Sequence, residues 1–179
     1  MSDQVRRRLR VAGVVQGVGF RPFVHTQAMA LGLGGFVGND PEGVLIEAQG
    51  TPDALDELQR RLRHEAPPLA VIHELRAETI SVEHAGAAVD GAPGAGAARP
   101  TFRIIGSAHG AGTTSIPADV AVCADCLAEM RDPADRRHGY PFIACTHCGP
   151  RFTITTGLPY DRDGTTMVGF PLCEQCLAE

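Results

Sequence analysis

The chain contains no lysine, no tryptophan and no long apolar run. All sixteen basic residues among its 179 are arginine, a bias that we attribute to genome composition rather than to function. A membrane-spanning helix needs about 20 apolar residues, and no apolar run in the chain approaches that length, so the sequence predicts no membrane partner. Arginines are frequent near the N-terminus, but no apolar signal segment follows them. We therefore predict no export signal and expect a cytoplasmic protein.

A basic excess is also missing. The formal net charge is −5 at pH 7, and residues 108–179 carry five arginines against nine acidic residues. Surfaces that bind nucleic acid usually carry an excess of basic side chains. The charge therefore argues against a nucleic-acid partner, although this acidic half holds all six cysteines.

The most informative segment that is present is Val11–Arg21, which reads V-A-G-V-V-Q-G-V-G-F-R. It follows an alternating strand pattern and precedes Pro22, whose fixed φ suits the first position of a helix. Its glycines allow a tight loop that turns several backbone N–H groups toward one point, as an oxyanion site requires. The planar guanidinium of Arg21 can bind two phosphate oxygens. A plain glycine-rich turn is the alternative, but the length of the run and its Arg-Pro end favour a phosphate-binding loop.

The first 107 residues show a β-α-β-β-α-β order, which predicts an α+β, ferredoxin-like fold. The second helix has the clearest pattern, with Thr51 as its cap, Pro52 at its first position and leucines at helical spacing. The expected strands are 6–13, 34–40, 43–50, 71–83 and 101–106, and the expected first helix is 22–32. Residues 85–99 are low in complexity and predict a flexible insert. We therefore divide the chain into a domain over residues 1–107, a linker over 108–118 and a zinc-finger region over 119–179.

Six cysteines form three C-x-x-C pairs, spaced C-x2-C-x18-C-x2-C-x24-C-x2-C. Two such pairs complete a four-cysteine zinc site, and a reducing compartment favours metal over disulfides. The segment from Cys123 to Glu129 recurs from Cys173 to Glu179 at an offset of 50 residues, so the first four cysteines are expected to bind one structural zinc ion. These are Cys123, Cys126, Cys145 and Cys148. A pairing of the middle pair with Cys173 and Cys176 remains the alternative.

If the first four cysteines bind one zinc ion, Cys173 and Cys176 are half of a second zinc site. The repeat predicts a further C-x-x-C about 18 residues beyond Cys176, so we expect the sequence to be cut short and its second finger to be truncated.

Val11–Arg21 resembles the acylphosphatase signature V-x-G-x-V-Q-G-V-G-F-R at every specified position. The family also has an asparagine in a G-F-V-x-N-x-x-x-G context, which Asn39 matches. Gly38 departs from the family, which usually has a longer side chain there, and the following strand reaches Gly50 one residue early.

This resemblance implies that the substrate phosphoryl group is held by Arg21 and by loop amides, and that Asn39 orients a water for attack on phosphorus. No metal is expected in that site. The amides belong to Gln16, Gly17, Val18, Gly19 and Phe20.

The cysteine half extends the resemblance. Together with the cysteine spacing, the segments 132–137, 140–143, 148–154 and 158–162 resemble the N-terminal part of the HypF family. That family comprises the carbamoyltransferases of nickel–iron hydrogenase maturation. The resemblance implies carbamoyl phosphate as substrate and a HypE-type maturation protein as partner. In the family, an adenylate-forming domain and a carbamoyl-transfer domain follow the fingers, so these residues alone are not expected to make the carbamoyl-adenylate.

Two hypotheses follow. In the first, the chain is an enzyme that hydrolyses an acyl phosphate. In the second, it is a zinc-stapled module that binds carbamoyl phosphate, or docks, without catalysis. Turnover of an acyl phosphate separates the two.

Overall fold

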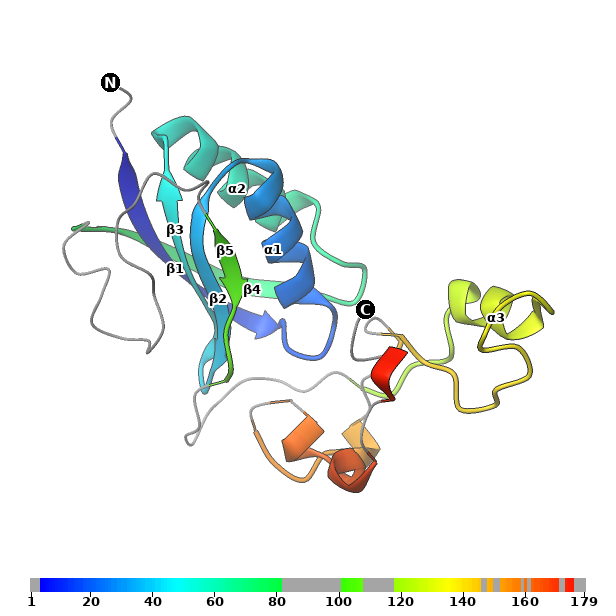
Figure 1. The fold of residues 1–179 in the computed structure, drawn as a ribbon. Coiled ribbons are helices and arrows are strands. Elements are labelled where there is room, and N and C mark those ends of the chain that lie inside the picture. The colour runs from blue at the N-terminus through cyan, green and yellow to red at the C-terminus, as the bar shows by residue number, and fades with distance from the viewer. Residues whose placement is uncertain are drawn as a thin grey trace.

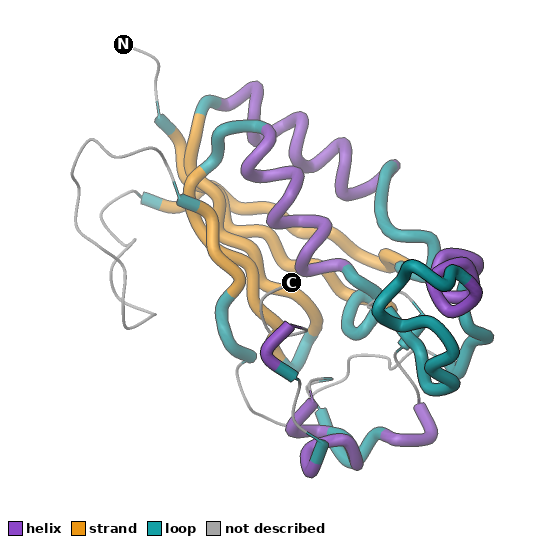
Figure 2. Tube along the Cα trace, turned by 45° about the vertical axis from the view of Figure 1, so that its right-hand side comes forward, coloured by secondary structure: helices purple, strands orange, loops and turns teal. Residues whose placement is uncertain are grey.

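The first half of the chain is a five-stranded mixed sheet with two helices packed on one face, as Figures 1 and 2 show. The computed structural model describes residues 4–81, 101–107, 118–145, 148–149, 152–158, 160, 162–170 and 173–175. The strand order is β4-β1-β3-β2-β5. The elements are β1 (Val5–Val14), α1 (Phe20–Ala30), β2 (Gly34–Asp40), β3 (Gly43–Gly50), α2 (Pro52–His64), β4 (Val71–Ile80) and β5 (Phe102–Ile104).

Pairing in the sheet is antiparallel except between β2 and β5, which run parallel. Strand β1 lies between β3 and β4, and the hairpin of β2 and β3 brings Asn39 opposite Val44. This is the α+β arrangement expected from the sequence. Strand β5 is shorter than the expected 101–106, and the expected insert 85–99 lies outside the described residues, as do 108–117 of the linker.

Other expected boundaries are also wrong: β4 ends at Ile80 instead of residue 83, and both ends of the first helix differ. Helix α1 begins at Phe20 instead of Pro22, because Gly19 adopts the left-handed conformation (φ 74°) that starts the helix two residues earlier. Pro22 is still tolerated there, since the first N–H groups of a helix have no intrahelical acceptor. The earlier start places Arg21 inside the first turn.

The core lies between the sheet and the two helices. Helix α2 buries its three leucines, and the Thr51 side chain accepts a hydrogen bond from the Ala54 N–H at 3.3 Å. The cap and the buried leucines both match the sequence pattern, because apolar residues spaced three and four positions apart lie on one face of a helix. The buried apolar residues of the other elements include Leu9, Val11, Val24, Val37 and Ile46.

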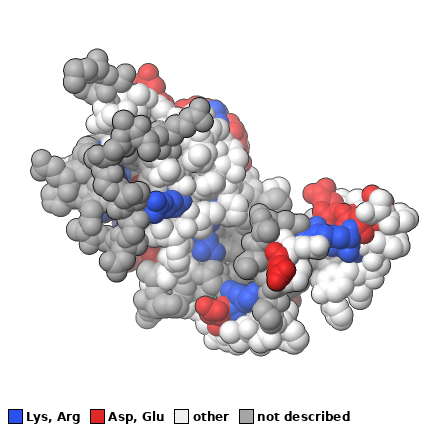
Figure 3. Space-filling model, in the orientation of Figure 1, with Lys and Arg blue, Asp and Glu red and all other residues white. Residues whose placement is uncertain are grey.

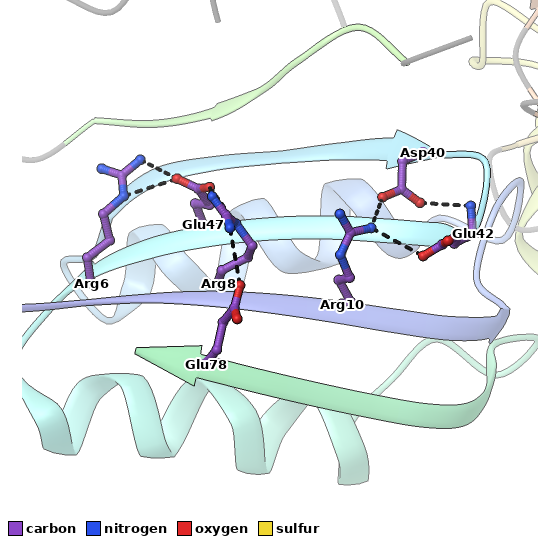
Figure 4. Close-up of polar contacts among 7 residues, drawn as sticks. All are labelled: Arg6, Arg8, Arg10, Asp40, Glu42, Glu47 and Glu78. Carbon is purple, nitrogen blue, oxygen red and sulfur yellow. Dashed lines mark hydrogen bonds and ion pairs between the residues drawn. The ribbon is translucent and has the colours of Figure 1, made fainter. Parts of the chain in front are cut away.

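Ion pairs cover part of the sheet face opposite the helices (Figure 4). Glu47, which is 4% exposed, accepts hydrogen bonds from Arg6 at 2.7 Å and from Arg8 at 2.9 Å. Hydrogen bonding to Glu47 raises the pKa of the Arg8 guanidinium. Arg10 in turn pairs with Asp40 at the end of β2. A buried carboxylate needs such partners, and here they join β1 to β3 and anchor the turn beside Asn39.

The second half has little regular structure in its described residues. Helix α3 (Ala124–Arg131) follows Cys123, and three single turns follow later: η2 (Phe152–Ile154), η3 (Arg162–Gly164) and η4 (Thr166–Gly169). These turns lie beyond the end of the sheet at which β1 leads into α1 (Figures 1 and 2). No helix among the described residues is long and apolar enough to cross a membrane.

On the face drawn in Figure 3, arginines of the described residues occur in several separate places, and at the right they lie beside acidic side chains.

Candidate functional site

The loop between β1 and α1 is held tightly in the core. Val15 and Val18 are 1% and 0% exposed, so their buried side chains anchor the loop in the core. Between and after them, Gly17 and Gly19 have φ values of 72° and 74°. Side-chain-bearing residues rarely adopt this conformation, so the glycines of the sequence motif are required by the path of the backbone.

The backbone N–H groups of this loop are not used by the described parts of the protein. From Gln16 to Phe20, none donates a hydrogen bond to an acceptor among the described residues. The loop carbonyl of Gly19, by contrast, accepts from the N–H of Phe23 in α1 at 3.1 Å. The first turn of α1 has neither a side-chain cap nor an acidic residue. Unused N–H groups at a helix N-terminus form a site for an anion.

Gln16 has a structural role that its position in the motif did not reveal. Its amide is 1% exposed, and Nε2 donates to Asp40 O at 2.9 Å and to Gly43 O at 2.7 Å. Its Oε1 accepts from the Tyr160 N–H at 3.0 Å. Two carbonyls on one side and an N–H on the other fix the orientation of this amide. Gln16 therefore ties the loop both to the β2–β3 turn and to the cysteine half.

Asn39 lies one residue before that turn and shows the opposite behaviour. It is 2% exposed, yet neither Nδ2 nor Oδ1 has a hydrogen-bond partner among the described residues. Leaving a buried polar group unsatisfied costs about 1–3 kcal/mol, so such groups usually have a ligand or a water. Because Gln16 bonds to Asp40 O, the unpaired amide lies one residue from a direct contact of the loop.

Arg21 occupies the second position of α1 and is half-buried. Its Nη1 lies 3.4 Å from the hydroxyl of Ser107, which follows β5. The segment after β5 continues along β2, since the Ile105 N–H donates to Val37 O at 2.9 Å. No motif in the sequence indicates that this segment reaches Arg21.

The segment after β5 also explains why a residue without a side chain, Gly38, occupies its position in β2. A Cβ added at Gly38 would lie 2.7 Å from Cγ1 of Ile105, so the side chain of Ile105 occupies the space that a longer residue would need. The departure from the acylphosphatase pattern is thus matched by a neighbour that fills the gap.

Four cysteine sulfurs form a cluster in the second half. The Sγ atoms of Cys123, Cys126, Cys145 and Cys148 all lie within 4.8 Å of one another, and the four residues are free of disulfides. Three of their separations are 3.8, 3.8 and 3.7 Å. A tetrahedron with Zn–S bonds of about 2.3 Å has S···S edges of about 3.8 Å, so the cluster has the size that zinc requires.

The structure thus brings together the four cysteines that the repeat grouped. Cys173 is exposed and does not belong to this cluster, and Cys176 lies outside the described residues. The rival pairing, which needs Cys173 beside Cys145 and Cys148, does not match this arrangement.

Local hydrogen bonds and burial also act on the cysteines of the cluster and shift the pKa values of two of them. Cys123 caps α3, and its Sγ accepts from the Cys126 N–H at 3.5 Å. Burial raises the pKa of Cys126. At Cys148 burial acts in the same direction, but backbone hydrogen bonds from Cys145 and Cys123 outweigh it and bring the pKa to about 7. Zinc binds thiolates, so metal binding here would release protons.

Two family models match the chain. The acylphosphatase model matches residues 7–87, and the HypF finger model matches residues 122–155. The acylphosphatase of Caldivirga maquilingensis is 44% identical over 80 residues, a match that covers 44% of this chain and 83% of that protein.

Longer relatives match both halves together. Carbamoyltransferase HypF2 of Cupriavidus necator is 54% identical over 171 residues, which covers 94% of this chain and 20% of that protein. A crystal structure of full-length HypF in the phosphate- and nucleotide-bound form superimposes with a TM-score of 0.87 at 38% identity. That match covers 99% of this chain and 22% of the other. The chain therefore spans about a fifth of the length of these relatives.

Proposed function

Since the chain belongs to the acylphosphatase family through its first half and matches the N-terminal region of HypF carbamoyltransferases over nearly its whole length, we propose that it hydrolyses a small acyl phosphate, with carbamoyl phosphate as substrate. The observation that carries this proposal concerns hydrogen bonding among the described residues. The buried amide of Asn39 has no partner there, and the N–H groups of the adjacent loop donate to no acceptor there. A site made of free donors and one unsatisfied amide is suited to a phosphoryl group and a water.

The loop and Arg21 bind the phosphoryl group in this mechanism. The N–H groups of Gln16, Gly17, Val18, Gly19 and Phe20 supply hydrogen bonds, and the Arg21 guanidinium supplies charge and a planar pair of donors. These donors are fixed before substrate arrives, because Val15 and Val18 hold the loop in the core. Preorganised donors stabilise the charge that builds on the phosphoryl oxygens as the reaction proceeds.

Asn39 then orients the attacking water. Its Oδ1 accepts a hydrogen bond from the water, which attacks phosphorus in line with the bond to the acyl oxygen. That bond breaks, and the acyl carboxylate, here carbamate, leaves with the electron pair. The two protons of the water are shared between phosphate and solvent, so water and carbamoyl phosphate give phosphate and carbamate. A carboxylate is a good leaving group, so the reaction needs neither a covalent protein intermediate nor a strong base.

Zinc has a separate, structural role in the proposal. Cys123, Cys126, Cys145 and Cys148 hold one Zn²⁺ in a closed site, where it supplies folding energy to the second half. The separations of their sulfur atoms support this assignment. No metal takes part at the acyl phosphate site.

The extent of the HypF match supports a wider setting. We infer that the chain acts as the N-terminal portion of a carbamoyltransferase for nickel–iron hydrogenase maturation, in the cytoplasm and together with a HypE-type protein. In that setting the hydrolysis of carbamoyl phosphate supplies carbamate to later steps.

Phosphate release from carbamoyl phosphate by the purified chain tests the proposal. The enzyme hypothesis predicts release well above the spontaneous rate and saturation with substrate. The alternative, a module that only binds carbamoyl phosphate or docks, predicts no release above the spontaneous rate.

A further inference from the structure

Asp40, the last residue of β2, accepts hydrogen bonds from three different segments of the chain. Its backbone oxygen accepts from Gln16 Nε2 at 2.9 Å. Its carboxylate accepts from the Arg10 guanidinium of β1 and, at 2.9 Å, from the Glu42 N–H in the following turn. Asp40 is 9% exposed, so these partners fix both its backbone and its side chain. The residue directly before it is Asn39.

Arg10 reaches Asp40 across the sheet face opposite the helices (Figure 4). It extends from β1 past β3, and its Nη1 atom bonds to Asp40 Oδ2 and lies 3.5 Å from the Glu42 carboxylate. The side chain of Asp40 is 12% exposed, so salt and water screen this pair less than they screen a fully exposed pair. Arg10 thus holds Asp40 through its carboxylate, whereas Gln16 holds it through its backbone.

Asn39 depends on such outside support because its own side chain makes no hydrogen bond to a described residue. It is 2% exposed, and neither Nδ2 nor Oδ1 has a partner there. Its amide is therefore placed by packing and by the backbone, whose next residue is Asp40. Successive side chains of a strand point to opposite faces. Arg10 can accordingly hold Asp40 from one face of the sheet while Asn39 points to the other, as the buried Val37 does.

We propose that Arg10 is a positioning residue for acyl phosphate hydrolysis: through its pair with Asp40 it fixes the backbone that places the Asn39 amide. The proposal rests on the proposed function. Misplacement of a reacting group by about 1 Å can lower a rate by about 100-fold, so loss of the pair should lower kcat. The affinity for phosphate should remain, because buried side chains of the loop itself hold the loop in the core.

Arg10→Gln tests this proposal in the full chain with zinc bound. The measurements are kcat for phosphate release from carbamoyl phosphate and the dissociation constant of inorganic phosphate. We expect kcat to fall by about tenfold, less than the loss expected on removal of Asn39 itself, and the dissociation constant to change by less than about twofold.

Arg76→Gln is the matched control. Arg76 lies opposite Arg10 on β4 and pairs with Glu74 instead of Asp40. The control therefore removes the same charge from the same face of the sheet without breaking the pair with Asp40. It should retain the kcat of the intact chain.

Two further variants separate positioning from a general effect on the fold. Arg10→Lys should recover most of the lost kcat, because the single nitrogen Nη1 makes the contacts with Asp40 and Glu42 and an ammonium group can replace it. In an Asn39→Ala background, Arg10→Gln should lower kcat by less than about twofold, because the group that the pair positions is gone.

Three results would overturn the proposal: an unchanged kcat in Arg10→Gln, an equal loss in Arg76→Gln, or a full tenfold loss in the Asn39→Ala background. A fall in phosphate affinity as large as the fall in kcat would overturn it as well, because Arg10 would then act on the phosphate-binding loop.

NMR spectroscopy distinguishes failure of this proposal from failure of the proposed function. The two side-chain N–H signals of Asn39 are assigned by their absence from the spectrum of Asn39→Ala. Arg10→Gln should shift them and Arg76→Gln should not, whether or not the chain hydrolyses carbamoyl phosphate. If these signals shift but the intact chain releases no phosphate above the spontaneous rate, the proposed hydrolysis fails and positioning of Asn39 by Arg10 stands. Signals that Arg10→Gln leaves in place would overturn the positioning role.

Discussion

At the scale of single residues, the chain contains two buried amides in opposite states. Gln16 has three hydrogen bonds and joins three segments of the chain. Asn39 has none among the described residues, although it is equally buried. A satisfied amide stabilises the fold, whereas an unsatisfied one weakens it and is retained where a ligand completes it. This contrast separates the positioning role of the first from the catalytic role that we propose for the second.

Replacement of Asn39 by alanine should separate catalysis from binding and stability. If Asn39 orients water, kcat for acyl phosphate hydrolysis falls by about two orders of magnitude. Inorganic phosphate should bind with nearly the same affinity, because other groups hold it. The free energy of unfolding should stay the same or rise, since an unsatisfied polar group is removed. Equal losses of phosphate affinity and kcat would instead place Asn39 among the phosphate ligands.

Replacement of Arg21 should remove both binding and turnover while the fold remains. Arg21→Ala loses the guanidinium at the start of α1, and most hydrolysis and phosphate affinity should go with it. Arg21→Lys should also be poor, because a point charge cannot reproduce two parallel hydrogen bonds. Circular dichroism checks that both variants are folded. A folded alanine variant with the rate of the intact chain would contradict the assignment.

At the scale of elements, the parts that local signals specify could be predicted from the sequence. The bounds of the β2–β3 hairpin, the cap at Thr51 and the buried face of α2 all follow from nearby residues. The start of α1 was placed two residues late, because the sequence does not reveal that Gly19 takes the left-handed conformation.

Contacts between distant segments could not be predicted. Nothing near Gln16 shows that its side chain meets Tyr160, and nothing near Gly38 shows that Ile105 fills the space above it. Such contacts depend on the whole path of the chain, which periodicity and turn signals do not contain. The motif residues of the candidate site could be proposed from the sequence, whereas their neighbours in the structure could not.

The contact of Gly38 with Ile105 gives a prediction about the β2 edge. Gly38→Val should displace Ile105 and destabilise the first half by about 1–3 kcal/mol, as overpacking usually does. Because Ile105 precedes Ser107, which lies beside Arg21, hydrolysis should also weaken. The measurement is urea unfolding together with phosphate release.

A double variant provides the control for this prediction. Adding Ile105→Ala should recover much of the lost stability, because the smaller side chain makes room for the valine. If Ile105→Ala and Gly38→Val are simply additive, the two side chains do not compete for the same space.

At the scale of the whole molecule, the two halves are stabilised differently. The first half has an extended apolar core between sheet and helices. The core of the second half, among its described residues, is a small cluster around Cys126, Ile143 and Cys148. Small domains with little apolar burial often rely on a metal for stability, and this described core is of that kind.

Zinc binding by the chain should therefore depend on the first four cysteines alone. Cys123→Ser should lower bound zinc in the purified chain to well below one ion per chain, whereas Cys173→Ser, a matched change outside the cluster, should not. The measurement is metal analysis by mass spectrometry. Loss of zinc from the Cys173 variant with retention in the Cys123 variant would establish the rival pairing.

Removal of zinc should act on the second half only. A chelator should unfold the cysteine half and leave the sheet domain folded, since metal binding contributes folding energy to its own unit. Near-complete loss of the sheet signal in circular dichroism would show that the halves fold as one.

The most direct measurement of the central claim is hydrolysis of carbamoyl phosphate in water enriched in ¹⁸O. Attack by water on phosphorus predicts rapid release of phosphate that carries one labelled oxygen, with release about two orders of magnitude slower in Asn39→Ala and mostly lost in Arg21→Ala. Phosphate release no faster than in the absence of protein, or enzyme-dependent release of unlabelled phosphate, would contradict the account.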